Sequence, residues 1–461
     1  MEIRDPIHGF IILKGEEVEI ICSSVFQRLR RIRQLAFANL VYPGALHTRF
    51  DHTLGVFCLA ERMAASGNLD LDQKRLVRLA ALLHDLGHGP FSHVTEQVLE
   101  IFANYEELSR KLGGKKPDKI HELVTQDILS SDPSLNRILG KQRIEDVKNL
   151  LSRGHEDPVL KAIISGPLDA DKQDYLLRDS YFCGVKYGIF DIDRLHLIFK
   201  FESNNHEEKT LMVAPDGVHT LEQFVLAKYF LTAQVYGHRV RRITDQMIVR
   251  AIVLGIEEDG IDLLRKLFTY SGEESFCANF VQWDDWRFMS AFGGPDSKHG
   301  YCQDLIARLT ERRLLKEIFD KPQSALPESC RATIKEISKP KHRARRRSIE
   351  AQIAASLQNS GVNLDGSLPN PEKLVIVQDY SLKSVREQSR NDEGSIMIAE
   401  DPPVPFEEAS QLFRSIDDKL TVPHFAVYAP VSYDNPIEKK RLRSKAEKAI
   451  IACLEDLKDG E

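Results

Sequence analysis

The chain has 461 residues, of which 42% are hydrophobic and 29% charged, and its formal net charge is −6. This composition is typical of a globular protein with two or three domains, and the net negative charge argues against general binding to nucleic acid or an anionic membrane. No apolar run reaches the roughly 18 residues that a membrane-spanning helix needs, and the N-terminus lacks a signal-peptide core. The seven cysteines include no C-x-x-C pair, so we expect reduced thiols and a cytoplasmic protein.

Helical periodicity dominates the first part of the chain. Apolar residues recur at helical spacing over 54–63 and 76–83, which predicts a helix in each segment. The sequence of 221–256 predicts a further long helix. Residues 198–214 predict a short β excursion on either side of a polar loop. These segments favour a mainly helical body.

The character of the sequence changes after residue 335. The run KPKHRARRR at 339–347 is strongly basic, and 363–373 is rich in Gly, Pro, Asn and Asp. Strand-like and helix-like segments follow: KLVIVQDYS, GSIMIAE, HFAVYAP, and apolar-periodic stretches near 406–416 and 436–457. We therefore predict three parts, which are a helical domain over 1–335, a basic segment and linker over 336–373, and a small α+β C-terminal lobe over 374–461.

The stretch LLHDLGHGPFSH, residues 82–93, places an adjacent histidine and aspartate at the end of an apolar helix. A lone histidine on a helix is usually structural, but burying His84 beside Asp85 without a partner would be costly. A divalent cation would pair them, because imidazole nitrogen and carboxylate oxygen are ordinary ligands of Zn, Mn, Fe and Ni. The glycines and the proline that follow break the helix and let His88 and His93 point toward a cleft.

Two other segments offer further ligands. LHTRFDHTLGV, residues 46–56, places His52 at the start of a helix. DADKQDYLLRDS, residues 169–180, places three polar residues at i, i+4 and i+8 on one helix face, bordered by a lysine: Asp171, Tyr175 and Asp179, with Lys172. Such a face is often only solvated surface, but these residue types would also suit a metal flanked by a phosphate and a sugar.

These segments resemble the H…HD…D signature of the HD-domain metal-dependent phosphohydrolases. Wider motifs occur in the order found in the deoxynucleoside triphosphate (dNTP) triphosphohydrolase branch: RDPIHGFI, FQRLRRIRQL, YPGALHTRFDHTLGV, LLHDLGHGPFSH, HE at 121–122 and DADKQDYLLRD. The resemblance covers roughly residues 1–255. It implies a mainly α fold, with a helical HD-domain catalytic core and, beyond it, the small α+β lobe.

The resemblance also implies a metal site and a reaction. One divalent metal (Mn, Fe, Ni, Zn, Co or Mg) would be held by His52, His84, Asp85 and Asp171, with open positions for water and phosphate oxygen. The family cleaves between the α-phosphorus and the 5′ oxygen of a dNTP, releasing a deoxynucleoside and triphosphate. The implied catalytic residues are His93 as the acid, Glu96 to hold it protonated, His88 and His121 on the phosphates, and Glu122 in support of that cluster.

The same resemblance implies residues that bind the substrate. Fixed positive charges on the phosphates would come from Arg49 and Lys172. Gln34 and Asp179 would bind the sugar 3′-hydroxyl, and Tyr175 would stack where a 2′-hydroxyl would clash. Lys228 and Tyr236 fall near the distal phosphate and the base, and His47 is equally compatible with a supporting or a structural role.

The resemblance further implies a homo-oligomer, either a dimer or a tetramer, because FQRLRRIRQL lies at a subunit contact in the family. Some members are activated by guanine nucleotides between subunits. Gln27 and Arg30 match that regulatory site, whereas Cys22, Pro215 and Gly217 replace its acidic and cationic groups. We therefore do not expect GTP to activate through that site. The basic run at 339–347 stays open as a site for a nucleotide effector or nucleic acid, or as a merely solvated charge run.

Two other functions fit parts of the sequence. An HD-type nuclease or phosphodiesterase acting on single-stranded nucleic acid would use the same metal site, with the basic run as its specific support. A regulatory nucleotide-binding protein with a vestigial site is the other, and the complete H…HD…D set argues against it.

Overall fold

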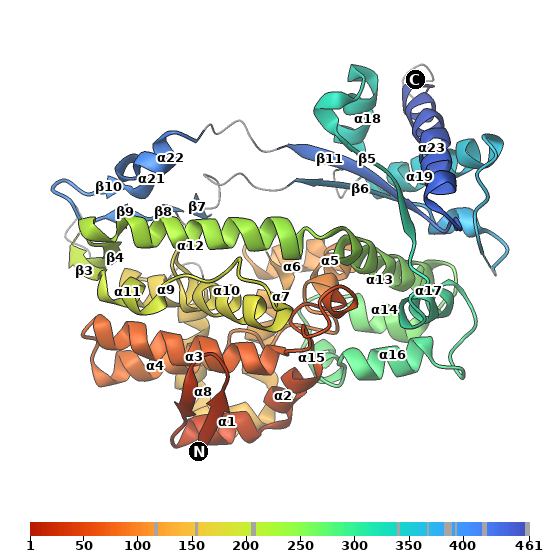
Figure 1. Cartoon of the computed structure of the whole chain (residues 1–461). Coiled ribbons are helices and arrows are strands. Elements are labelled where there is room, and N and C mark those ends of the chain that lie inside the picture. The colour runs from red at the N-terminus through yellow and green to blue at the C-terminus, as the bar shows by residue number, and fades with distance from the viewer. Residues whose placement is uncertain are drawn as a thin grey trace. The chain divides into compact units, whose positions relative to one another are not determined.

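The computed structural model describes residues 1–114, 119–152, 155–203, 209–338, 342–366, 368–381, 390–391, 394–416 and 422–456. Its contacts divide the chain into two compact units, each built from several segments. Figure 1 labels the helices and strands named below. Unit 1 comprises Met1–Tyr236, Arg265–Phe288 and Ser384–Lys419, and unit 2 comprises Gly237–Leu264, Met289–Lys383 and Leu420–Glu461. The domain boundaries expected near 335 and 373 stay a prediction.

Unit 1 is mainly helical, as the sequence predicts. A hairpin of β1 (Glu2–Asp5) and β2 (Gly9–Ile12) opens the chain. The helices that follow are α1 (Glu16–Cys22), α2 (Ser24–Gln27), α3 (Arg49–Ser66), α4 (Leu71–Leu83), α5 (His93–Phe102), α6 (Tyr105–Lys111), α7 (Ile120–Ser131), α8 (Pro133–Leu151), α9 (Pro158–Ser165), α10 (Ala170–Cys183), α11 (Ile192–Leu197), α12 (Val218–Leu231) and α15 (Glu274–Phe280). Two more helices, α14 (Asp262–Phe268) and α16 (Asp285–Gly293), contain residues of both units.

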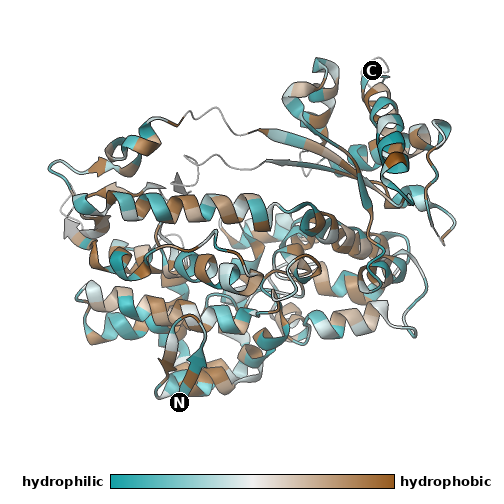
Figure 2. Cartoon of the chain, viewed as in Figure 1, coloured by the Kyte–Doolittle hydropathy of each residue, from teal (hydrophilic) through white to brown (hydrophobic). Residues whose placement is uncertain are grey.

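Local signals explain where the central helices begin. At the start of α3, the Asp51 carboxylate accepts the backbone N–H of Thr48 at 2.8 Å. At the start of α4, Asp70 and Gln73 accept each other's backbone N–H at 2.8 and 3.1 Å, which completes a capping box. The apolar face expected over 54–63 is buried. Figure 2 shows teal and brown residues mixed along α12, and the apolar side chains of Leu221, Phe224 and Val225 in this helix are buried.

Helix α3 packs against α4 and α10, and the approach to α10 depends on a glycine. A Cβ on Gly55 would lie 1.8 Å from Asp174 Oδ1 and 2.5 Å from Arg178 Nη2. The absence of a side chain at this position therefore lets α10 bring a buried carboxylate and guanidinium against α3.

We expect Gly55→Ala to destabilise the protein by about 1–3 kcal/mol, because an added methyl group would overpack this contact. In an ordinary exposed helix position the same change stabilises by about 1 kcal/mol, so the sign of the effect tests the close approach. Thermal unfolding of the variant and the wild type measures it. Ala65→Gly, at an exposed position of the same helix, is the control for backbone propensity. A Gly55→Ala protein as stable as the wild type would contradict the expectation.

One sequence prediction for this region is confirmed and one is wrong. The β excursion at 198–214 is the antiparallel pair β3 (Phe199–Ser203) and β4 (Lys209–Val213). The single helix expected across 221–256 is instead interrupted: α12 ends at Leu231, a π-helical turn covers Thr232–Tyr236, and α13 (Arg239–Glu257) begins after the His238 cap. Gly237 within the break disfavours helix and is the local signal for it.

The sheet of unit 1 takes two strands from late in the chain. β9 (Met397–Ile398) pairs in parallel with β4, and β10 (Val404–Pro405) pairs with β9, giving the order β10-β9-β4-β3. Two short helices, α21 (Phe406–Ala409) and α22 (Gln411–Arg414), follow, and β7 (Arg390–Asn391) and β8 (Gly394–Ser395) form a separate pair. The strand and helix signals near 394–400 and 406–416 are thereby confirmed.

Unit 2 contains α13, α17 (Tyr301–Thr310), and an antiparallel sheet in the order β5 (Lys316–Pro322), β11 (Pro423–Ala429), β6 (Ile376–Ser381). Three helices share its apolar core: α18 (Glu328–Ile337), α19 (Arg343–Asn359) and α23 (Pro436–Asp456). The strands and the helix expected in the C-terminal part are confirmed as β6, β11 and α23. Among the described residues, no helix combines the length and hydrophobicity that crossing a bilayer requires.

Candidate active site

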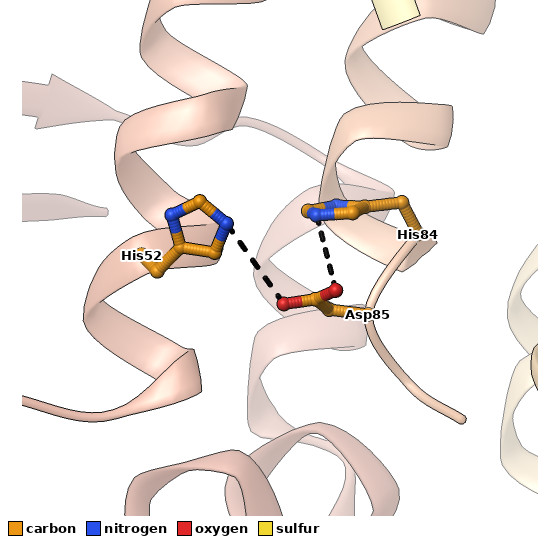
Figure 3. A group of neighbouring side chains, drawn as sticks. All are labelled: His52, His84 and Asp85. Carbon is orange, nitrogen blue, oxygen red and sulfur yellow. Dashed lines mark ion pairs between the residues drawn. The ribbon is translucent and has the colours of Figure 1, made fainter. Parts of the chain in front are cut away.

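Three helices of unit 1 bring together four side chains with metal-ligating atoms. His52 lies in the first turns of α3, His84 and Asp85 directly follow α4, and Asp171 is in the first turn of α10. One ligand atom from each of His52, His84 and Asp85 lies within 4.8 Å of the others (Figure 3). Asp171 Oδ1 is 2.9 Å from His52 Nε2. The four residues that the sequence singled out as metal ligands are thus neighbours in space.

Hydrogen bonds orient both histidines for metal binding. The Nδ1–H of His52 donates to Asp174 Oδ2 at 2.8 Å, and the Nδ1–H of His84 donates to the Ala81 carbonyl at 2.8 Å. Both Nε2 atoms are buried; that of His52 lies 2.9 Å from Asp171 Oδ1 and that of His84 lies 3.3 Å from Asp85 Oδ1, and neither makes a well-aligned hydrogen bond within the described residues. Buried polar atoms are costly without a partner, and metal-bound histidines are held in this way through the other ring nitrogen. These two nitrogens therefore fit a divalent metal ion.

The charges around the site also favour a cation. Burial alone would lower the pKa of His52, but the carboxylates of Asp171 and Asp174 outweigh it and raise that pKa to about 10. Burial would raise the pKa of Asp85, yet Arg49, His84 and His88 hold it well below its usual range. The carboxylates thus stay ionised and favour positive charge at His52 Nε2, the position that a metal would share.

Behind His52 lies a buried network that the sequence analysis did not identify. Asp174 accepts hydrogen bonds from His8 Nε2 at 2.7 Å, from His52 Nδ1, and from two nitrogens of Arg178 at 2.8 and 2.9 Å. Arg178 also pairs with Asp5 at 2.9 Å. The N-terminal hairpin therefore supports the ligand His52 through Asp174.

Histidines and an arginine line one side of the four-residue group. His88 Nε2 is 3.3 Å from Asp85 Oδ1, and its ring stacks on that of His121 with centroids 4.3 Å apart. Arg49 donates to Asp85 Oδ2 at 2.7 Å, and its Nη2 is 3.3 Å from His93 Nε2. Burial and Arg49 lower the pKa of His88 well below its usual value, so this imidazole is neutral. The structure thus brings four of the expected phosphate and acid residues together.

The two expected glutamates have partners at the start of α7. Glu96 accepts the backbone N–H of Ile120 at 2.6 Å and that of His121 at 2.9 Å, and its Oε2 is 2.9 Å from His121 Nδ1. It therefore orients His121 directly, and its expected effect on His93 stays a prediction. Glu122 forms an ion pair with Lys119 at 3.0 Å.

A second polar cluster lies further along α10. Asp179 is buried, with one oxygen 2.7 Å from His47 Nε2 and the other accepting from the Tyr236 hydroxyl at 2.5 Å. The rings of Tyr175 and Tyr236 meet edge to face, 6.1 Å apart. Gln34 is buried, and its Oε1 has no hydrogen-bond partner. Of the residues expected around the sugar and base, Tyr236 thus contacts both Asp179 and Tyr175, and His47 contacts Asp179 as well.

The expected lysines have different surroundings. Lys172 forms an ion pair with the buried Asp169 at the start of α10. Lys228 is half-buried in the last turn of α12. Both roles on the phosphates remain predictions.

The residues compared above with the family's regulatory nucleotide site, and those of the basic run, have the following surroundings. Cys22 is exposed, Arg30 Nε donates to Gln27 Oε1 at 3.0 Å, and Pro215 and Gly217 lie in a 3₁₀ turn before α12. Of the basic run, residues 339–341 lie outside the described part of the chain. Three arginines of the remainder form ion pairs within unit 2: Arg343 and Arg347 with Glu257, and Arg346 with Asp379.

Comparison with known proteins identifies the class to which this fold and site belong. The model of the HD domain matches residues 49–196, and that of the HD associated region matches residues 191–445, more than half of the chain. The chain belongs to the HD-domain superfamily of phosphohydrolases. Members bind divalent metals, which agrees with the group of His52, His84 and Asp85.

Individual relatives are similar over parts of their length. The uncharacterized protein MJ1154 of Methanocaldococcus jannaschii is 39% identical over 57% of this chain and 51% of its own. The deoxynucleoside triphosphate triphosphohydrolase SAMHD1 of Bos taurus is 31% identical over 68% of this chain, which spans 58% of that protein. A crystal structure of a hypothetical protein from Aquifex aeolicus, 27% identical, superposes with a TM-score of 0.68 and covers 96% of this chain and 99% of its own.

Proposed function

We propose that this protein hydrolyses dNTPs to a deoxynucleoside and tripolyphosphate, with one divalent metal on His52, His84, Asp85 and Asp171. The main support is the presence on one helix, α10, of two polar groups that belong to different parts of the site. Asp171 contacts the expected metal ligand His52, and Asp179 belongs to the second polar cluster. Eight residues of helix separate them by about 12 Å, a span suited to a phosphate at one end and a sugar and base at the other. The similarity to SAMHD1, a protein named for this reaction, agrees with the proposal.

The side chains beside the metal ligands suit the chemistry. A bound divalent metal would supply charge for a phosphate oxygen and a lowered pKa for water. Arg49, already against Asp85 and near His93, would neutralise phosphate charge. As water adds its oxygen to the α-phosphorus and the bond to the 5′ oxygen breaks, His93 would give that oxygen its proton. One water is consumed, and one deoxynucleoside and one tripolyphosphate result.

We expect purified protein to release tripolyphosphate from dNTPs, and to turn over dATP at least tenfold faster than ATP. The sugar preference follows if the second polar cluster fits deoxyribose, because a buried clash or unpaired hydroxyl costs about 1–3 kcal/mol and each 1.4 kcal/mol is a factor of ten. Ion chromatography and nucleoside analysis after incubation with each dNTP and rNTP, with Mg, Mn, Co and Ni in turn, measure both. Pyrophosphate or orthophosphate as the sole inorganic product would exclude the proposed reaction.

The observations do not favour a nuclease over this reaction. The specific support for a nuclease is the basic run at 339–347. Its residues Arg343, Arg346 and Arg347 already have carboxylate partners. Paired arginines offer less net charge to a nucleic-acid backbone. A labelled single strand belongs in the same assay, and its degradation at a rate comparable to dNTP turnover would reverse this preference.

A further inference from the structure

The loop that leads into His93 has a backbone conformation that L-residues rarely adopt. Phe91 and Ser92 have φ angles of 62° and 54°, and both are buried. Each such residue costs about 1–3 kcal/mol and persists only where its surroundings hold it. His93 follows directly as the first residue of α5, so the geometry of this loop sets where its ring lies.

A buried carboxylate distant in sequence holds the loop. Asp285, the first residue of α16, accepts the backbone N–H of Phe91 with Oδ1 at 2.7 Å. With Oδ2 it accepts the backbone N–H of Arg33 at 3.0 Å. The residue is only 5% exposed. One side chain thus ties the strained loop to the segment that follows α2.

A second tie joins the same two segments and connects them to the active site. The hydroxyl of Ser92 donates to the Arg33 carbonyl at 2.7 Å and accepts from Arg49 Nε at 3.0 Å. Arg49 in turn contacts Asp85 and His93. The position of Phe91 therefore affects both the residue proposed as the acid and the arginine beside it.

Opposing effects determine the ionisation of Asp285. Burial raises the pKa of Asp285 to about 7, although two backbone N–H groups and Arg33 oppose the shift. The adjacent Asp284 forms the ion pair with Arg31 instead, at 2.5 Å. Burial therefore disfavours the ionised form of Asp285, and the two backbone N–H groups favour it. The clear effect of this side chain is the placement of two backbone N–H groups.

We propose that Asp285 is a positioning residue of the active site, which fixes the backbone at Phe91 and so directs His93 toward the leaving oxygen. This inference rests on the proposed function for the identity of the leaving group. The tie to Phe91 itself is independent of the reaction. Within the described part of the chain, the hydrogen bonds of the Asp285 side chain go to the backbone of Arg33 and Phe91, so a change there acts through the loop.

The test compares Asp285→Asn with Asp284→Asn, a matched loss of one carboxylate on the neighbouring residue. Asn keeps the shape of Asp285 but can accept only one of the two N–H groups. We expect kcat for dNTP hydrolysis to fall by about 10- to 100-fold, the range for a displaced catalytic group, with KM changed less than about threefold. The limb of the pH–rate profile that belongs to the acid should shift, and bound metal should stay at the wild-type level. Asp284→Asn should match the wild type in all of these.

A second measurement, hydrogen exchange, does not depend on enzymatic turnover. Hydrogen exchange measured by mass spectrometry on the peptide containing Phe91 should be faster in Asp285→Asn than in Asp284→Asn, because the Phe91 amide loses its acceptor. Asp285→Glu, which keeps a carboxylate, should recover part of both the protection and kcat. It also serves as the test variant if the Asn protein does not fold.

The outcomes separate this inference from the proposed function. Equal kcat, pH profile and exchange in Asp285→Asn and Asp284→Asn would overturn the positioning role. So would a loss of activity that only parallels a loss of bound metal or of folded protein. A wild type that releases no deoxynucleoside would refute the proposed function instead, and the exchange measurement would still decide whether Asp285 holds the loop.

Discussion

Asp85→Asn is expected to abolish metal binding and to lower kcat/KM for dNTP hydrolysis by roughly 10²–10⁴-fold. Asp85 is buried between Arg49 at 2.7 Å and two imidazoles at 3.3 Å, and its ionised form is the one favoured there. A metal ion in such a site would supply several kcal/mol of charge stabilisation in the transition state, and each 1.4 kcal/mol is a factor of ten, so loss of the metal accounts for the expected fall. A neutral amide also leaves Arg49 without its counter-charge next to His93.

Metal content measured by mass spectrometry and titration calorimetry with Mn²⁺ checks the first effect, and product release checks the second. Asp72→Asn, at an exposed aspartate of α4, is the control for the loss of one negative charge, and it should behave as the wild type. Circular dichroism establishes that both variants are folded. If Asp85→Asn retained metal and turnover, the assignment of the centre would be wrong.

Asp174→Asn is expected to lower the free energy of unfolding by about 3–5 kcal/mol and metal affinity by about 10–100-fold. Each Asp174 oxygen accepts from one histidine and from Arg178, and all of these side chains are at most 3% exposed. Asn can accept on one side only and would direct N–H groups at a histidine and a guanidinium on the other. The variant would therefore leave the positive charge of Arg178 only partly neutralised and would fix the ring of His52 less firmly.

The pH dependence of this effect has a definite sign. Burial would raise the pKa of Asp174, but Arg178, His52 and His8 hold it well below its usual value. A carboxyl with a lowered folded-state pKa contributes stability that is fully present above its unfolded value of about 4 and is lost as the pH falls below that value. The difference in thermal unfolding between wild type and variant should thus shrink below about pH 4.

Asp193→Asn provides the control for Asp174→Asn, because it removes an exposed ion pair with Arg62 that is expected to contribute little. Calorimetry of the three proteins between pH 3 and pH 8 measures the stability. An equal, small change in both variants would show that the network behind His52 does not hold the ligand.

Sequence patterns predicted the parts of this fold whose signals are local. The apolar spacing over 54–63 and 76–83 places helices α3 and α4, since both periodicity and the caps at Thr48 and Asp70 lie within a few residues. The resemblance to HD proteins singled out His52, His84, Asp85 and Asp171, and the structure makes them neighbours. Local reasoning failed across 221–256, where apolar spacing continues through a break that the single Gly237 marks.

The supporting residues had no local signal. Asp174 stands three positions after Asp171 on α10, and its contact with His52 requires a glycine at position 55 of another helix. His8 meets Asp174 across 166 residues of sequence, and Asp285 meets Phe91 across 194. Such pairs are set by tertiary packing, so neither periodicity nor motif spacing in one sequence could indicate them.

The late strands of unit 1 have a consequence for how the protein is made. β9 pairs with β4 at Ile398 and Val213, and the Ala399 amide donates to the Val213 carbonyl at 2.8 Å. Ribosomes deliver the chain from the N-terminus, so synthesis must reach Ile398 before this sheet can close. Until then one edge of β4 presents unpaired backbone groups to other nascent chains. Unit 1 therefore completes its fold late in translation, and a chain ending before residue 397 would expose an edge that favours aggregation.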